Sequence, residues 1–294
     1  MKQILILLAF TASTISEITL ANDDDYKLVW SDEFNQDGKL SDEWDYEVGF
    51  KRNWELQWYQ PQNAYCKDGL LVIEGRKETL PNPNYNPNGN WRQIRQQIHY
   101  TSASVRTKKS WQYGRIEVKA RIKAEEGLWP AIWTLGNKGQ WPNNGEIDIM
   151  EFYGGKILAN LAWGTERKWT AEWDSVEIPV KSLNDAEFNN KFHVWHMDWT
   201  EDSIKIYMNN KLINSCSLSE TVNRNRRGPK NPFKQPHYLI LNLAIGSTGG
   251  DPKNVQFPTK YEIDYVRVYQ KQSDLTLKKQ NLPISKKPLN GKTL

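Results

Sequence analysis

The chain lacks several features that would place it in other classes of protein. It has only two cysteines in 294 residues, which excludes a multi-disulfide scaffold and a four-thiolate zinc site. Its 39 Lys and Arg nearly balance 35 Asp and Glu, and a net charge of +4 does not indicate nucleic acid or a membrane surface as a partner. Helical periodicity is nearly absent, and no apolar run is long enough to span a bilayer.

Tryptophan is the residue that the sequence has in excess, with 14 Trp against 4 Met. Many of these indoles are expected in the core, because Trp is a large and mainly apolar side chain. An excess of this size also suits a sugar-binding cleft, where flat rings lie against the C–H faces of pyranoses. The composition therefore admits a polysaccharide as partner.

The two ends of the chain differ from its middle. Residues 1–21 have the order of a secretory signal peptide, with a positive start, an apolar run and a small-residue cleavage pattern that ends at Ala21. An apolar first strand is the alternative, but a very polar stretch follows directly. Residues 271–294 are polar and Lys-rich, and we expect a flexible tail there. These features predict a secreted or periplasmic protein, a monomer, in which Cys66 and Cys216 are permitted to form a disulfide.

The middle segment, residues 22–270, consists of strand and turn patterns. Residues 113–122 alternate between apolar and charged side chains, which is typical of a half-buried antiparallel strand. Asp68-Gly69 and Asn209-Asn210 are turn signals beside apolar runs. Many short antiparallel strands in one long segment predict an all-β fold, a two-sheet antiparallel β-sandwich of the jelly-roll type.

Three carboxylates stand close together in the segment 146–151, Glu-Ile-Asp-Ile-Met-Glu. On a regular strand Glu146 and Asp148 share one face, because side chains alternate with a period of two. Glu151 would point to the other face unless one extra residue interrupts the alternation. We therefore predict a β-bulge at Ile149-Met150 that returns Glu151 to the side of the other two acids.

Three like charges on one face are costly, and no Lys or Arg lies between Gly139 and Gly155 to offset them. A solvated acidic strand and a calcium site are two interpretations. The third is catalysis, with one acid ionised and one protonated near neutral pH. Two carboxylates that flank a sugar bond are what glycoside hydrolysis requires.

With these residues in place, the chain resembles family 16 of the glycoside hydrolases, in its laminarinase-like branch. The resemblance runs from about residue 28 to residue 270 and rests on several motifs in the family's order. These are Leu-Val-Trp-Ser-Asp-Glu-Phe-Asn at 28–35, Glu-Leu-Gln-Trp-Tyr at 55–59, Gly-Leu-Trp-Pro-Ala-Ile-Trp-Thr-Leu at 127–135, the acidic segment in its Met-containing form, Gln-Pro-His-Tyr-Leu at 235–239, and Tyr-Glu-Ile-Asp-Tyr-Val-Arg-Val-Tyr at 261–269. It implies a concanavalin A-like jelly roll with a concave substrate cleft, and a catalytic domain over residues 22–270.

The resemblance also implies the chemical roles of the three acids. Glu146 would be the nucleophile of a retaining mechanism, and Glu151 the general acid and base. Asp148, between them, would hydrogen-bond the nucleophile and support its charge. No cofactor would be required for catalysis.

Further residues resemble substrate-binding positions of the family, or are candidates because of their type. Trp129 resembles the family's sugar-stacking Trp, with Trp133 on the same strand, and core packing is the alternative for both. Trp163 stands where laminarinases carry a second His, which leaves the subsite contacts and the linkage preference open and favours mixed-linkage glucan over pure laminarin. The remaining candidates are Asn53, Glu55 and Trp58, which resemble the loop on the donor side of the cleft, and Arg95 and Gln235, which we expect to bond sugar hydroxyls.

A structural calcium site is a separate expectation. Asp264 has the parity of Val266 and Val268, and a charged residue on an apolar face requires a partner. By resemblance, calcium would be bound by Asp264 with the main-chain oxygens of Glu33 and Gly75. A salt bridge or a capped turn is the alternative.

The leading interpretation is a secreted endo-acting hydrolase of 1,3- or mixed 1,3-1,4-β-glucan. Hydrolysis of marine galactans such as agarose, porphyran or carrageenan is the first alternative, and the basic stretch 224–230 is the one feature that favours it. A non-catalytic β-glucan-binding protein and a transglycosylase are the others. Both glutamates are present, which argues against the non-catalytic form.

Overall fold

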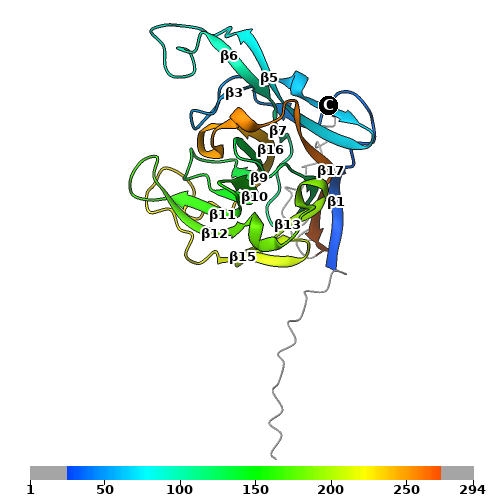
Figure 1. Cartoon of the computed structure of the whole chain (residues 1–294). Coiled ribbons are helices and arrows are strands. Elements are labelled where there is room, and N and C mark those ends of the chain that lie inside the picture. The colour runs from blue at the N-terminus through cyan, green and yellow to red at the C-terminus, as the bar shows by residue number, and fades with distance from the viewer. Residues whose placement is uncertain (1–24, 273–294) are drawn as a thin grey trace, which may run out of the picture.

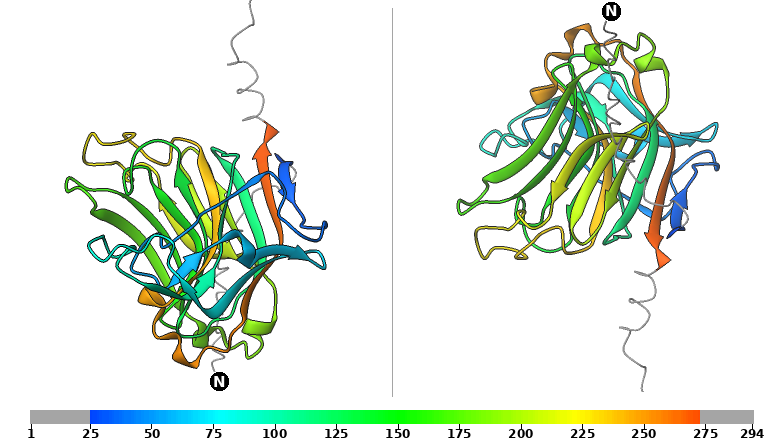
Figure 2. Two further views of the ribbon diagram at one scale, coloured as in Figure 1. Left: turned by 90° about the horizontal axis from the view of Figure 1, so that it is seen from above. Right: turned by 90° about the horizontal axis from the view of Figure 1, so that it is seen from below.

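The computed structural model describes residues 25–272, and within this range the chain folds into two stacked antiparallel-rich β-sheets (Figures 1 and 2). The predicted all-β sandwich is thereby confirmed. The predicted signal peptide lies outside the described residues, as does residue 273 onward of the predicted tail. No helix among residues 25–272 has the length and apolar character needed to cross a membrane.

Seventeen strands and five short 3-10 helices are present in the described part of the chain. The strands are β1 (Tyr26–Asp32), β2 (Trp44–Tyr46), β3 (Gln57–Tyr59), β4 (Ala64–Lys67), β5 (Leu70–Pro81), β6 (Gln97–Ser102), β7 (Ser104–Thr107), β8 (Gly114–Arg121), β9 (Leu128–Gly136), β10 (Glu146–Tyr153), β11 (Lys156–Gly164), β12 (Ala171–Pro179), β13 (His193–Trp199), β14 (Ser203–Met208), β15 (Lys211–Ser217), β16 (His237–Ile245) and β17 (Thr259–Lys271). The 3-10 helices are η2 (Pro61–Asn63), η3 (Val180–Leu183), η4 (Phe188–Asn190), η5 (Ser247–Gly249) and η6 (Pro252–Asn254).

The two sheets have different roles. One sheet has the order β12-β11-β10-β9-β16-β7-β2, and we call it the cleft sheet. The other runs β15-β14-β13-β8-β17-β5-β6-β3, with β1 paired to β17 and β4 to β5, and we call it the outer sheet. In Figure 1, β9 to β12 lie side by side, and the β5–β6 hairpin projects beyond the sandwich.

Local sequence patterns explain these elements. On β8 the apolar side chains of Ile116, Val118 and Ala120 are buried, and the charged residues between them alternate outward, as the pattern predicts. Asn209 and Asn210 both have positive φ and connect β14 to β15, since Asn tolerates the left-handed region. The core between the sheets contains Cys66 and Cys216 as separate buried thiols, so the permitted disulfide is not formed.

The core side of β10 generates a test of stability. Ile149 is fully buried between the sheets, whereas Ile94, in the loop before β6, is about half exposed. Ile149→Ala leaves a cavity, so we expect the free energy of unfolding to fall by about 2–5 kcal/mol. Ile94→Ala should change it by less than about 0.5 kcal/mol. Urea unfolding of both variants measures the difference, and equal values would contradict the described core.

Candidate active site

The three acids of β10 project from one face because the strand contains the predicted bulge. Asp148 lies opposite Asn160 on β11, while Glu151 lies opposite Leu158, so three steps on β10 match two on β11. The register against β9 shifts at the same place. Ile149 and Met150 both point into the core, and this extra inward residue turns Glu151 outward beside Glu146 and Asp148.

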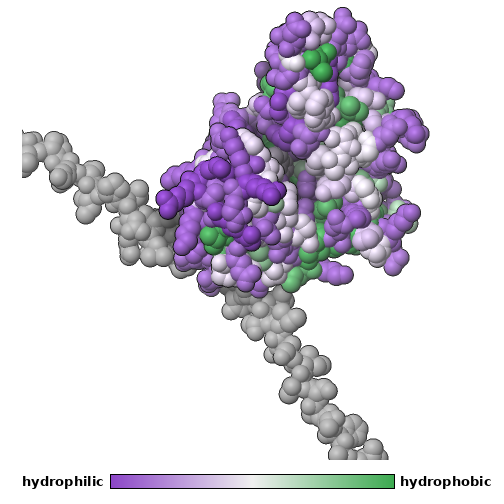
Figure 3. Space-filling view, turned by 90° about the vertical axis from the view of Figure 1, so that its left-hand side faces the viewer, coloured by the Kyte–Doolittle hydropathy of each residue, from purple (hydrophilic) through white to green (hydrophobic). Residues whose placement is uncertain are grey.

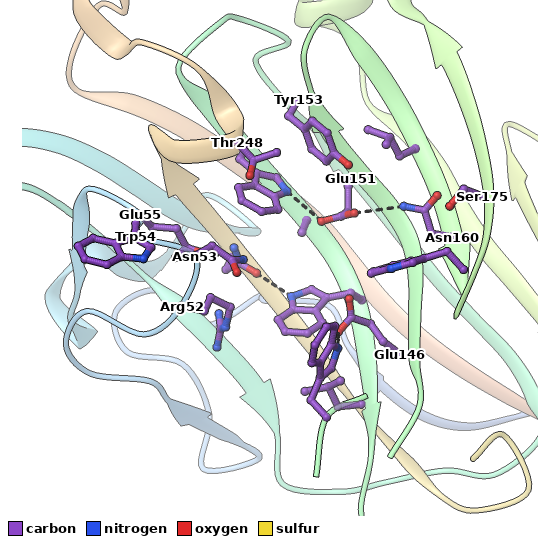
Figure 4. Close-up of a pocket in the computed structure, with 18 of the residues that line it drawn as sticks. Arg52, Asn53, Trp54, Glu55, Glu146, Glu151, Tyr153, Asn160, Ser175 and Thr248 are labelled. Atoms are coloured by element: carbon purple, nitrogen blue, oxygen red, sulfur yellow. Dashed lines mark hydrogen bonds between the residues drawn. The ribbon is translucent and has the colours of Figure 1, made fainter. Parts of the chain in front are cut away.

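Each glutamate receives a hydrogen bond from an indole. Trp141 Nε1 donates to Glu146 Oε2 at 2.8 Å, and Trp129 Nε1 donates to Glu151 Oε1 at 2.9 Å. The Asn160 amide donates to the other oxygen of Glu151 at 3.4 Å. These donors orient each carboxylate while leaving it open to the cleft (Figure 4). Asp148 is different, since it is only 1 % exposed and its Oδ2 has no hydrogen-bond partner within residues 25–272.

The environment raises the proton affinity of all three acids. Burial raises the pKa of Glu146 to about 8, and the charge of Glu151 adds to the effect. Burial also raises the pKa of Glu151 to about 7, against the lowering effect of its indole and amide donors. The pKa of Asp148 is raised well above its usual value by burial and by both glutamates. At neutral pH the three carboxyl groups therefore share protons rather than carry three charges.

Glu146 and Glu151 line a cleft of about 920 Å³ on the exposed face of the cleft sheet. Figure 3 shows a hollowed and largely hydrophilic surface on this side of the molecule. Aromatic side chains supply much of the wall. The lining residues are Arg52, Asn53, Trp54, Glu55, Arg92, Trp129, Ala131, Trp133, Leu135, Trp141, Glu146, Glu151, Tyr153, Leu158, Asn160, Trp169, Trp173, Ser175, Glu177, Asn242 and Thr248.

The structure brings four of the predicted binding residues into this cleft. Trp129 contacts Glu151 as described, and Trp133 donates its indole N–H to Asn242 Oδ1 at 2.7 Å, so Trp133 offers only its ring to a ligand. Asn53 and Glu55 lie in the loop at one end of the cleft (Figure 4). Burial raises the pKa of Glu55.

Arg95 does not line the cleft, which corrects its predicted contact with sugar hydroxyls. Its guanidinium donates to the main-chain oxygens of Glu55 at 2.6 Å and Trp54 at 3.0 Å. Asn53 and Trp54 have φ angles of 55° and 57°, an uncommon conformation for residues with side chains. Arg95 thus stabilises a strained loop from behind instead of binding the ligand.

Three more predicted residues point away from the cleft. Trp58 is 7 % exposed and packs edge-on against Phe50. Gln235 is buried and bonds the main chain of Lys138 and Asn144.

Trp163 is the third of these residues. On β11 the cleft-facing positions are Leu158 and Asn160, so Trp163 has the opposite parity and packs against Phe233 in the core. Its indole therefore does not replace a ligand-binding His.

The three proposed calcium ligands do not form one site. Gly75 pairs with Thr259, five residues from Asp264, which corresponds to about 16 Å along the strand. Asp264 is the extra residue of a bulge in β17, since Ile263 and Tyr265 oppose consecutive residues of β8. The bulge moves Asp264 off the apolar face, and its carboxylate pairs with Lys119 Nζ at 2.6 Å. The alternative of a salt bridge is what the structure shows, while Glu33 pairs with Arg267.

Several cleft residues were not predicted from the sequence. Trp141 and Asn160 had a usable signal, because Trp141 opens the acidic segment and Asn160 stands on the neighbouring strand opposite Asp148. Arg52 had none. Its guanidinium pairs with Glu47 and lies 5.1 Å from the centre of the Trp133 ring, and its charge opposes the rise in the pKa of Glu146. Glu47 reaches this position from the segment after β2, a long-range contact that no local pattern reveals.

A jelly-roll sandwich whose open cleft carries paired, proton-sharing glutamates among tryptophans defines a glycoside hydrolase. Residues 50–267 match the family described as Glycosyl hydrolases family 16, and the chain belongs to that family.

Known relatives agree with this assignment. The chain is 34 % identical over 267 residues to a beta-glucanase of Rhodothermus marinus, covering 83 % of this chain and 85 % of the relative. It is similar to a solved structure from work on endo-acting O-glycanases with which prominent members of the human gut microbiota initiate mucin breakdown (TM-score 0.78, 35 % identity, 89 % of this chain and 96 % of the other). It is also similar to the laminarinase catalytic domain of Thermotoga maritima (TM-score 0.69, 32 % identity, 84 % and 98 % covered).

The shared protons generate a prediction about stability and pH. The pKa of Glu146 is raised from 4.5 to about 8 in the folded protein, so its stabilising contribution is fully present below pH 4.5 and is lost as the pH rises through 8. Glu146→Gln mimics the protonated acid permanently. We expect its Tm to exceed that of the wild type by about 3 °C or more at pH 8, and by little at pH 5.

Glu201→Gln is the matched control, because Glu201 is a well-exposed surface carboxylate. Its Tm should follow that of the wild type at both pH values. Thermal melts of the three proteins measure the effect. A Glu146→Gln variant that is no more stable than the wild type at pH 8 would show that the acids do not strain the fold.

Proposed function

We propose that the protein is an endo-acting, retaining glycoside hydrolase in which Glu146 is the nucleophile and Glu151 the general acid and base. The observation that carries this proposal is the bulged strand, which presents two indole-held glutamates to an open cleft. An open cleft accepts the interior of a long chain, which supports endo action. Retention and the covalent intermediate come from the family resemblance.

In the proposed reaction, the Glu146 carboxylate attacks the anomeric carbon while Glu151 protonates the oxygen of the bond that breaks. A covalent glycosyl-enzyme forms, and Glu151 then removes a proton from the water that releases it. In the free protein burial raises the pKa of both glutamates into the neutral range, so neither is fully ionised near pH 7. The positive charge that develops on the sugar beside Glu146 favours its ionised form, so substrate moves the shared proton toward Glu151.

Asp148 supports the same charge shift. Burial and the two neighbouring glutamates raise its pKa, which favours the protonated form, and a protonated carboxyl group can donate a hydrogen bond to the ionised nucleophile. The Oδ2 atom that has no partner in residues 25–272 is available for this bond.

The proposed substrate is a β-glucan with 1,3-linkages, either laminarin-type or mixed-linkage 1,3-1,4. The beta-glucanase and laminarinase relatives support this class. The cations of the cleft also favour a neutral chain, because sulfate would need free guanidinium groups. Arg52 is paired with Glu47 through Nη2, while its Nη1, which has no partner within residues 25–272, is buried, and Arg92 bonds the main-chain oxygen of Lys51.

Mucin-type O-glycans are a second candidate substrate. The similarity to the O-glycanase structure favours it, with a TM-score of 0.78 against 0.69 for the Thermotoga maritima laminarinase. Such glycans also offer neutral pyranose faces to tryptophan. In either case we propose an exported monomer that needs no cofactor for catalysis, on the basis of the signal-peptide pattern and the all-protein acid pair.

The roles of the two glutamates can be tested separately. Glu146→Gln and Glu151→Gln should each lower turnover by more than about 100-fold, and Asp148→Asn should lower it less. With azide, Glu146→Ala should give the α-glycosyl azide, because azide attacks from the vacated side. Glu151→Ala should give the β-azide, because azide replaces water in the second step. Near-normal turnover in either Gln variant would contradict the roles.

The substrate is tested with a panel of pure glycans. We expect new reducing ends from laminarin or barley-type mixed-linkage glucan, and none from agarose, porphyran or carrageenan. Mucin O-glycans are included in the panel to test the second candidate substrate. Mass spectrometry of the products identifies the bond that is cut. Cleavage of a galactan alone would show that the glucan assignment is wrong and would leave the catalytic roles intact.

A further inference from the structure

The end of the cleft over β12 carries two exposed tryptophans that the catalytic mechanism does not use. Trp173 and Trp169 are 45 % and 54 % exposed, and both line the cleft. Trp173 is on β12, the edge strand of the cleft sheet, and Trp169 is in the turn that joins β11 to β12. Ser175 and Glu177 follow Trp173 at alternate positions and also line the cleft, so one face of β12 extends its floor.

The backbone at Trp169 is held in an unfavourable conformation. Its φ of 62° lies in the left-handed region, which bulky residues rarely adopt and which costs about 1–3 kcal/mol. The surrounding turn is closed by the main-chain oxygen of Thr170, which accepts from Thr165 N at 3.2 Å and Thr165 Oγ1 at 3.0 Å. The hydrogen bonds of the turn therefore hold Trp169 in place despite its unfavourable backbone conformation.

The basic stretch 224–230 braces the same turn. Arg224 N donates to the main-chain oxygen of Gly164 at 3.0 Å, and the Arg227 guanidinium donates to that of Glu166 at 3.3 Å. Asn225 Nδ2 bonds the side chain of Asn143, in the segment that leads into β10. Arg224 contributes its main-chain amide, and Asn225 makes the contact with the segment that leads into β10. The side chains of Arg224, Arg226, Arg227 and Lys230 are exposed at the surface of this stretch.

Both indoles have ring surface available for a ligand. The indole of Trp173, on a strand paired with β11, makes no ring contact and no side-chain hydrogen bond within residues 25–272. Lys168 Nζ lies 5.1 Å from the centre of the Trp169 ring and covers one side of it. β12 is two strands from β10, about 10 Å across the sheet, which is within reach of the sugar units next to the bond that is cut.

We propose that Trp169 and Trp173 form an aromatic platform that binds the pyranose rings on the acceptor side of the scissile bond. The Asn53–Glu55 loop, which the family resemblance places on the donor side, lies at the opposite end of the cleft (Figure 4). The C–H faces of β-linked sugars cover exposed indoles favourably, and the fixed turn lowers the entropy cost of that contact. The inference rests on the proposed glycosidase function.

The experiment compares two substrates with the same donor oligosaccharide. In one substrate the leaving group is a nitrophenyl group, which is too short to reach the platform. In the other the leaving group consists of at least three further sugars. Trp173→Ala and Trp169→Ala should each lower kcat/KM for the long leaving group about tenfold and leave the nitrophenyl substrate within about twofold. Trp54→Ala, at the donor end of the cleft, should affect both substrates alike.

Tyr85→Ala is the matched control, because Tyr85 is also 45 % exposed but does not line the cleft, and both of its rates should match the wild type. Equal losses on both substrates in Trp173→Ala and Trp169→Ala, or no loss on either, would overturn the platform while the wild type remains active. A wild-type protein that cleaves neither substrate would instead overturn the proposed function, and the platform with it.

Discussion

The constraint on which the site depends is the alternation of side chains along β10. A regular strand gives each face every second residue, and the acidic segment departs from this rule once, at Ile149-Met150. The departure buries two adjacent apolar side chains in the core and places three carboxylates on the cleft side. The same local change therefore serves packing on one face and chemistry on the other, and neither can be altered alone.

Placing three acids together creates an electrostatic cost that the surroundings reduce only in part. Two indole N–H groups and one amide bond the glutamates, but Arg52, whose charge lowers the pKa of Glu146, is also paired with Glu47. The remaining strain appears as raised pKa values of all three acids. In the free site the protonated forms of these carboxyl groups are favoured. A positive charge that develops on the sugar favours ionisation of one of them. The instability of the free site is thus part of its proposed reactivity.

The sequence predicted what depends on local periodicity. The β-sandwich, the strand over residues 113–122, the bulge and the shared face of the acids all follow from alternation and turn residues. Predictions failed where orientation depends on partners far along the chain. Trp58, Trp163 and Gln235 have the residue types of sugar-binding positions, yet register and packing turn them inward. The prediction for Asp264 was wrong for a related reason. A bulge in β17 that the sequence pattern did not predict changes the face on which Asp264 lies, and its carboxylate forms an ion pair with Lys119.

The two bulges show why residue type alone is a weak guide to a site. Both place a carboxylate out of alternation, but the one in β10 turns Glu151 toward neutral indole and amide donors, and the one in β17 turns Asp264 toward an ammonium group. An acid with a bonded cation is neutralised and structural, whereas an acid held by neutral donors in a buried cleft keeps a variable proton. The difference in chemistry between the two sides of this molecule is therefore set by what the neighbouring strands present to each bulge.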